Sequence, residues 1–156
     1  MAALGISVGS LAPDFQLPDH RGGKVRLSEV RAQSAVLLIF FPFAFTDVCT
    51  SELAALDTHV KNFHEQGVRV LGISCDSPYS LAAFAVREHL GFDLLSDFWP
   101  HGDVCRQYGV FLDDKGFALR GSFLIDRQGR ISWTLLNGPA EVRDPNAYEA
   151  ALATLA

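Results

Sequence analysis

Cys49 is the residue of this sequence whose type and position best suit nucleophilic chemistry. Pro42 ends the apolar run before it, and a helical pattern begins at about Val48. Cys49 is therefore expected in or near the first turn of a helix, where unpaired backbone N–H groups and the positive end of the helix dipole favour a thiolate. The thiolate is the nucleophilic form of cysteine. Thr46 lies three residues earlier, so its hydroxyl could bond the sulfur or an incoming oxygen.

The alternative is that Cys49 has a packing role, because free cysteine usually behaves as a small buried hydrophobe. Position alone gives the two roles about equal weight. Two other kinds of cysteine site fit the sequence poorly. Positions 46 and 52 hold no cysteine, so the C-x-x-C motif of disulfide oxidoreductases is missing. The three cysteines, Cys49, Cys75 and Cys105, also lack the close spacing of a zinc site.

The elements that must position Cys49 alternate between strands and helices. The continuous apolar run over residues 35–41 predicts a central strand that is buried on both faces. Apolar residues at a helical period predict one helix over 48–66, which Gly67 ends. A second buried strand is predicted over 68–74, and a second helix starts at Ser77-Pro78 and runs to about Leu90.

The flanking segments complete the predicted fold. A hairpin over residues 15–27 turns at Gly22-Gly23, and a short helix covers 103–108. Paired strands are expected over 119–125 and 130–136, and a last helix starts at Asp144-Pro145. This order predicts an α/β protein with a thioredoxin-like fold, in which helices flank a mixed central sheet.

Length and composition limit the class of protein. The 156 residues predict a single domain, residues 1–156. The net charge of -5 argues against nucleic acid as a partner, because such a surface needs a basic patch. The run over 35–41 is too short to cross a bilayer, and residues 1–11 lack the features of a signal peptide. We therefore expect no membrane partner and a cytoplasmic location, where thiols stay reduced.

The spacing Pro42-x-x-x-Thr46-x-x-Cys49 resembles the active-site signature of the peroxiredoxins. Further segments resemble that family in the same order over about residues 5–136. They are Ala12-Pro13-Asp14-Phe15, Gly72-Ile73-Ser74 with Asp76-Ser77, and Arg120-Gly121-Ser122-Phe123 with Asp126. The stretches 95–102, 108–111 and 141–144 are most similar to the actinobacterial, one-cysteine branch of the alkyl hydroperoxide reductase E type. The resemblance implies one thioredoxin-like peroxiredoxin domain.

The resemblance also implies a role for each site residue. Cys49 would be the peroxidatic cysteine, whose thiolate attacks a peroxide and becomes a sulfenic acid. Arg120 would stabilise the thiolate and the departing oxygen, and its alternative is a solvated strand arginine. Thr46 would hold the peroxide, serve as a helix N-cap, or do both. Pro42 would shield the sulfur, and Glu52 would support the site from the first turns of the helix, orienting Arg120 or Arg143.

The sequence leaves more than one candidate for the thiol that reduces the sulfenic acid. A resolving cysteine on the same helix would stand at position 54, which is Ala54, and the chain has no C-terminal extension with a cysteine. Cys105, in the predicted short helix, is a possible resolving residue, on equal terms with an external thiol. Cys75 ends a buried strand, where packing is the favoured role.

Partners and cofactors follow from the same resemblance. It implies a peroxide substrate, hydrogen peroxide, an organic hydroperoxide or peroxynitrite, and a homodimer. It implies no bound cofactor or metal, and reduction by a thioredoxin, a mycoredoxin or a low-molecular-weight thiol. The rival hypothesis is a peroxide sensor or chaperone-like module that uses the same cysteine without turnover. A thioredoxin-like reductase is disfavoured by the missing C-x-x-C motif.

Overall fold

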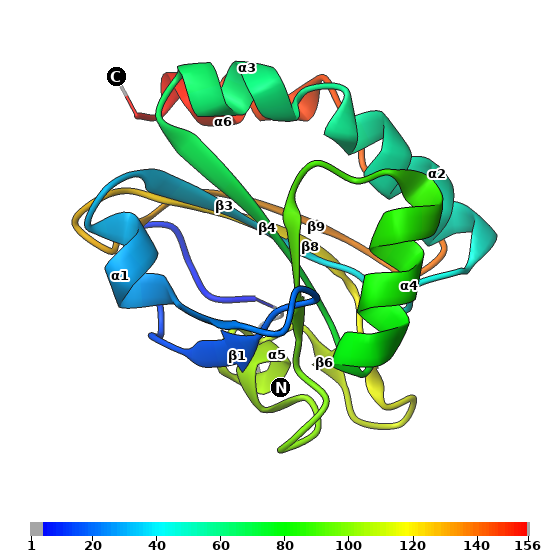
Figure 1. The fold of residues 1–156 in the computed structure, drawn as a ribbon. Coiled ribbons are helices and arrows are strands. Elements are labelled where there is room, and N and C mark those ends of the chain that lie inside the picture. Colours follow the sequence, from blue (N-terminus) through cyan, green and yellow to red (C-terminus); the bar gives the residue numbers. More distant parts are fainter. Residues whose placement is uncertain (1–4, 156) are drawn as a thin grey trace.

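A five-stranded mixed sheet forms the centre of the structure, a computed structural model that describes residues 5–155 (Figure 1). The strand order is β5-β4-β3-β8-β9. Strand β3 pairs in parallel with β4 and antiparallel with β8, so the sheet is mixed as predicted. The five strands are β3 (Ala35–Phe40), β4 (Val68–Ser74), β5 (Asp93–Ser96), β8 (Arg120–Ile125) and β9 (Ile131–Asn137).

Both faces of the sheet are covered, and each has its own apolar core. One core contains Leu37 and Ile39 of β3, and the other contains Val36 and Leu38, because successive side chains of a strand point to opposite faces. The first face packs against α2 (Asp47–Asp57), α3 (Val60–Glu65), α4 (Pro78–Glu88) and α6 (Ala147–Ala153). The second packs against β1 (Gln16–Pro18), β2 (Lys24–Arg26), α1 (Leu27–Arg31), α5 (Asp103–Gln107), β6 (Phe111–Leu112) and β7 (Phe117–Ala118). In Figure 1, α3 and α6 lie above the sheet, and α1, β1 and α5 lie below it. The predicted thioredoxin-like α/β architecture is confirmed.

The helix predicted over residues 48–66 is two helices, α2 and α3, so that prediction was wrong. The Thr58 hydroxyl donates to the carbonyl of Ala55 at 2.7 Å, a local bond that competes with helix continuation. The Asp57 carboxylate accepts from the backbone N–H of Gly91 at 2.7 Å. Because this contact joins segments far apart in the sequence, helical periodicity could not reveal where α2 ends.

The helices α4, α5 and α6 and the hairpin lie close to their predicted places. Helix α4 begins with Ser77 as N-cap and ends at Glu88, before the predicted end, because His89 takes a left-handed conformation with φ of 52°. The hairpin of β1 and β2 turns where predicted, and Gly22 has φ of +90°. The elements that the sequence analysis did not predict are α1, β5, β6 and β7. Every helix within residues 5–155 falls short of the length and apolar content that a membrane crossing requires.

Candidate active site

Cys49 lies in the first turn of α2, at the junction with strand β3. Thr46 is the N-cap residue, and its hydroxyl oxygen accepts from the backbone N–H of Cys49 at 3.3 Å. The same hydroxyl donates to the carbonyl of Phe43 at 3.2 Å. These two bonds stabilise the turn between strand β3 and helix α2. The N-cap interpretation of Thr46 is confirmed.

The loop before α2 is also held from neighbouring elements. The backbone N–H of Ala44 donates to Asp76 Oδ2 at 2.8 Å, and that oxygen accepts from the Ser74 hydroxyl at 2.6 Å. Phe45 has φ of 69°, a conformation that is strained for a bulky residue. Its ring packs edge-on against Phe84 of α4, with 5.2 Å between centroids. Packing and hydrogen bonds thus hold a loop conformation that the backbone alone disfavours.

Arg120 begins strand β8 and is 2% exposed, so its alternative interpretation as a solvated arginine is wrong. Its Nη2 donates to Cys49 Sγ at 3.1 Å, and its Nη1 donates to Glu52 Oε1 at 3.0 Å. Its Nε donates to the carbonyl of Pro139 at 2.8 Å. Because all three nitrogens of the guanidinium are engaged, the group is held in one orientation against the sulfur.

Glu52 lies one helical turn after Cys49 and joins Arg120 to a second buried arginine, Arg143. The Arg143 backbone N–H donates to Glu52 Oε2 at 2.7 Å, and its guanidinium forms an ion pair with Glu52 Oε1. Arg143 Nη1 also donates to the carbonyls of Phe40 at 2.8 Å and Gly121 at 2.9 Å. Arg143 therefore holds the loop after β9 against both β3 and β8, and it positions the Glu52 carboxylate that also accepts from Arg120.

The buried side chains around Cys49 carry more positive than negative charge. Two guanidinium groups, from Arg120 and Arg143, contact one carboxylate, that of Glu52. These side chains are 2%, 0% and 5% exposed, so water screens their charges weakly. A negative charge on Cys49 Sγ, which accepts a hydrogen bond from Arg120, would balance the remaining positive charge.

The ionisation of Glu52 gives a testable pH dependence of stability. Burial acts to raise the pKa of Glu52, but the hydrogen bonds and charge of Arg143, with the charge of Arg120, hold the pKa below its ordinary value of 4.5. The carboxylate therefore stabilises the fold above that value, and its contribution is lost as the pH falls through the lowered pKa. We predict that Glu52→Gln costs about 3–5 kcal/mol of unfolding free energy near neutral pH and progressively less in acid.

Denaturant unfolding of the wild type and Glu52→Gln across a pH series measures this difference. Glu149→Gln on the exposed side of α6 is the matched control, and its effect should stay small at every pH. A cost of Glu52→Gln that is constant from neutral pH to acid would contradict the prediction.

A surface pocket of about 320 Å³ opens beside the arginine that contacts the sulfur. It is lined by Pro42, Thr46, Asp47, Val48, Arg120, Pro139 and Ala140. Cys49 is fully buried next to this pocket. A small molecule that enters the pocket therefore meets the two predicted polar groups, Thr46 and Arg120, beside the apolar ring of Pro42.

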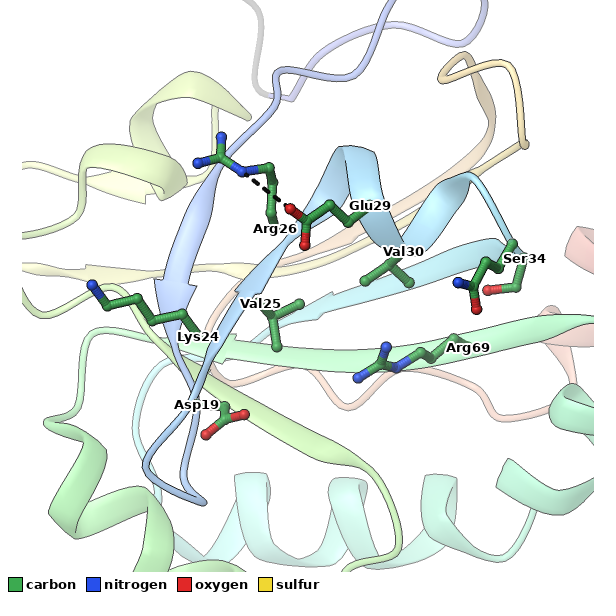
Figure 2. A pocket seen from close by; sticks show the side chains of 9 residues that line it. Asp19, Lys24, Val25, Arg26, Glu29, Val30, Ser34 and Arg69 are labelled. Atoms are coloured by element: carbon green, nitrogen blue, oxygen red, sulfur yellow. Dashed lines mark ion pairs between the residues drawn. The ribbon is translucent and has the colours of Figure 1, made fainter.

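Another pocket, of about 480 Å³, lies on other elements, between β2, α1 and β4 (Figure 2). Its charged side chains have both signs. Arg26 forms an ion pair with Glu29 at 3.9 Å, the dashed line of Figure 2, and Arg69 pairs with Asp93 at 2.6 Å. Because its lining residues include no cysteine or histidine and it lies on other elements than α2, this pocket does not take part in the chemistry of Cys49.

The structure does not bring Cys105, the possible resolving residue, together with Cys49. Cys49 belongs to the core beneath α2, whereas Cys75 and Cys105 belong to the core on the opposite face of the sheet. All three cysteines are free and buried. Pro42, Thr46, Glu52 and Arg120 do gather around Cys49. Arg143 also belongs to this buried cluster, although the sequence indicated it only as a contact of Glu52. Its place in the cluster depends on a loop far from α2 in the sequence.

The sequence matches the model of the AhpC/TSA family over residues 8–134. It is 43% identical over 150 residues to alkyl hydroperoxide reductase E of Mycobacterium tuberculosis strain H37Rv, covering 96% of this chain and 98% of that protein. It is 41% identical over 133 residues to peroxiredoxin Bcp of Escherichia coli K12, covering 81% of this chain and 83% of that protein.

Solved structures of similar proteins have the same fold. Peroxidoxin BcpB from Mycobacterium tuberculosis superposes with a TM-score of 0.81 at 32% identity, covering 98% of this chain and 97% of that one. The reduced 2-Cys peroxiredoxin of Plasmodium vivax superposes with a TM-score of 0.85 at 32% identity, covering 95% of this chain and 81% of that one.

Proposed function

Because the chain belongs to the AhpC/TSA family of peroxiredoxins and is a thiol-dependent peroxidase, we propose that Cys49 is the residue that attacks the peroxide. The observation that carries this proposal is the 3.1 Å contact between Arg120 Nη2 and Cys49 Sγ inside a buried cluster with surplus positive charge. A thiolate at this position would be stabilised by that charge. In the part of the chain that the structure describes, no guanidinium group donates a hydrogen bond to Cys75 or Cys105.

The first step would be attack of the Cys49 thiolate on one oxygen of the peroxide. The S–O bond forms as the O–O bond breaks, and the sulfur is oxidised to a sulfenic acid. The other oxygen leaves as hydroxide or alkoxide and takes a proton from solvent water, which gives water or an alcohol. Arg120 lines the pocket and would stabilise the charge that develops on the leaving oxygen. The Thr46 hydroxyl, at the pocket wall, would orient the peroxide, and Pro42 would limit access of water to the sulfur.

The sulfenic acid would then be reduced by an external thiol. The thiol sulfur bonds to Cys49 and water leaves, and a second thiol releases Cys49 in its reduced form. The separation of Cys49 and Cys105 by the sheet favours this route over an internal disulfide. Bonding those two residues would need large local unfolding, since disulfides tolerate Cα separations only up to about 7 Å.

The reductant would be a thioredoxin, a mycoredoxin or a small thiol, and the reaction needs no bound cofactor. We place the protein in the cytoplasm, where such thiols are kept reduced. A single peroxiredoxin domain over residues 1–156 is supported by the family match over 8–134. A homodimer is supported by Phe98 and Trp99, large apolar side chains that are 50% and 79% exposed, and sedimentation velocity tests it.

The number of peroxide molecules consumed per chain tests turnover against sensing. With excess external thiol we expect many equivalents of peroxide to be consumed at a steady rate. Without thiol, consumption should stop after about one equivalent, because no internal thiol regenerates Cys49. Arrest after one equivalent in the presence of several classes of thiol would instead support the peroxide sensor.

A further inference from the structure

Three buried groups outside the Cys49 site converge on the opposite face of the sheet. Cys75 follows strand β4, Asp97 follows β5, and Cys105 lies in α5. One sulfur from each cysteine and one carboxylate oxygen of Asp97 all lie within 4.8 Å of one another. The three residues are 2%, 1% and 0% exposed. The chain thus builds a compact S-S-O donor set from three segments that are well separated in the sequence.

The donor set is held by neighbouring backbone bonds. Asp97 Oδ1 accepts from the backbone N–H of Val104 at 3.2 Å, and Oδ2 accepts from the backbone N–H of Cys105 at 2.8 Å. The Asp97 backbone N–H donates to the carbonyl of Ser74 at 2.8 Å, which ties the loop after β5 to the end of β4. These bonds fix the carboxylate while leaving lone pairs on its oxygens, the arrangement that orients carboxylate ligands in metal sites.

The electrostatics of the cluster favour a positive charge at its centre. Burial raises the pKa of Asp97. The hydrogen bond with Cys75, burial and the charge of Asp97 raise the pKa of Cys105. The ion pairs formed by residues 5–155 do not include Asp97. Burial thus opposes the negative charge of Asp97 and of a Cys105 thiolate, and a cation held by both groups would offset that cost.

We propose that Cys75, Asp97 and Cys105 form a binding site for one thiophilic divalent cation of the Zn²⁺ class. Two thiolates with one carboxylate are a donor set that suits Zn²⁺, with water as a fourth ligand. Zn–S bonds of about 2.3 Å place two sulfurs roughly 3.8 Å apart in a tetrahedral site. The two sulfurs lie within 4.8 Å of each other, so they need to close by at most about 1 Å. The bound ion would tie the ends of β4 and β5 to α5.

The site lies close to the surface although its donors are buried. Phe98 and Trp99 directly follow Asp97 and are 50% and 79% exposed. The three donor residues lack the close spacing in sequence that is usual for zinc ligands. They come together only in the folded chain, so a search for spacing motifs does not find this site.

Titration of the reduced Cys49→Ser protein with Zn²⁺, and with Cd²⁺ as a spectroscopic probe, tests the proposal free of the peroxidase cysteine. We expect one ion per chain, thiolate-to-metal charge-transfer absorption with Cd²⁺, and a higher melting temperature with Zn²⁺. Adding Cys105→Ser or Cys75→Ser should weaken binding by about 100-fold, and Asp97→Asn by about 10-fold. Adding Ser51→Ala, on the exposed face of α2, should change nothing.

Circular dichroism establishes that each variant is folded before titration. Should one cysteine variant unfold, the other and Asp97→Asn report on the same site. The proposal fails if Cys49→Ser binds less than one ion per chain, or if folded cysteine variants bind as tightly as their parent. Formation of a Cys75–Cys105 disulfide in place of metal binding would also overturn it. None of these outcomes depends on peroxidase activity, so they leave the assignment of Cys49 unaffected.

Discussion

Replacing Cys49 by serine will lower peroxide consumption by on the order of 10⁴-fold or more, to the level without protein. The serine hydroxyl occupies the same buried position and can still accept from Arg120, so the fold should be preserved. It cannot form the S–O bond on which the reaction depends. Initial rates of peroxide loss at saturating external thiol measure the effect.

The matched control for this variant is Ser51→Ala, two residues further along α2 on its exposed face. It should retain the full rate, and thermal unfolding should show both variants folded. Wild-type rates in a folded Cys49→Ser protein would remove Cys49 from the mechanism.

Arg120→Met will lower kcat/KM for peroxide by about 10²–10³-fold, the range found when a donor to a developing oxyanion is removed. Methionine fills similar space but removes the bond to Cys49 Sγ and the charge next to the pocket. The kcat/KM of Arg120→Lys should lie between those of the wild type and Arg120→Met. Lysine keeps the positive charge, but one ammonium group cannot reach Cys49, Glu52 and Pro139 together as the guanidinium does.

Arg127→Met, at the exposed turn between β8 and β9, is the control for general effects of losing an arginine. It should leave kcat/KM unchanged. Peroxide concentration series give kcat and KM for each variant, and unfolding curves separate lost chemistry from lost stability, since Arg120 also pairs with Glu52. A folded Arg120→Met protein within about threefold of the wild-type kcat/KM would contradict the role given to this contact.

Local patterns predicted the parts of the fold that depend on neighbouring residues. The apolar runs fix β3 and β4, since a strand buried on both faces needs continuous apolar side chains. The turn at Gly22 and the N-caps at Thr46 and Ser77 are also local features. The break after α2 was missed because it depends on the distant bond between Asp57 and Gly91.

The candidate site was predictable to the extent that its residues share one short segment. Pro42, Thr46, Cys49 and Glu52 stand within one strand-to-helix junction. Arg120 was identified through resemblance, since nothing in its local sequence separates it from a surface arginine. The contacts of Arg143 with Glu52, and of Cys75 with Asp97 and Cys105, arise only when the sheet assembles, so no spacing rule contains them.

The most direct test of the central claim is the site of oxidation after one equivalent of peroxide. The reduced protein is treated, a sulfenic-acid trap is added, and peptides are analysed by mass spectrometry. We predict that the trapped sulfenic acid is on the peptide of Cys49, while Cys75 and Cys105 stay reduced. A trap adduct on Cys75 or Cys105 with Cys49 still reduced would contradict the assignment of Cys49 as the peroxide-reactive residue.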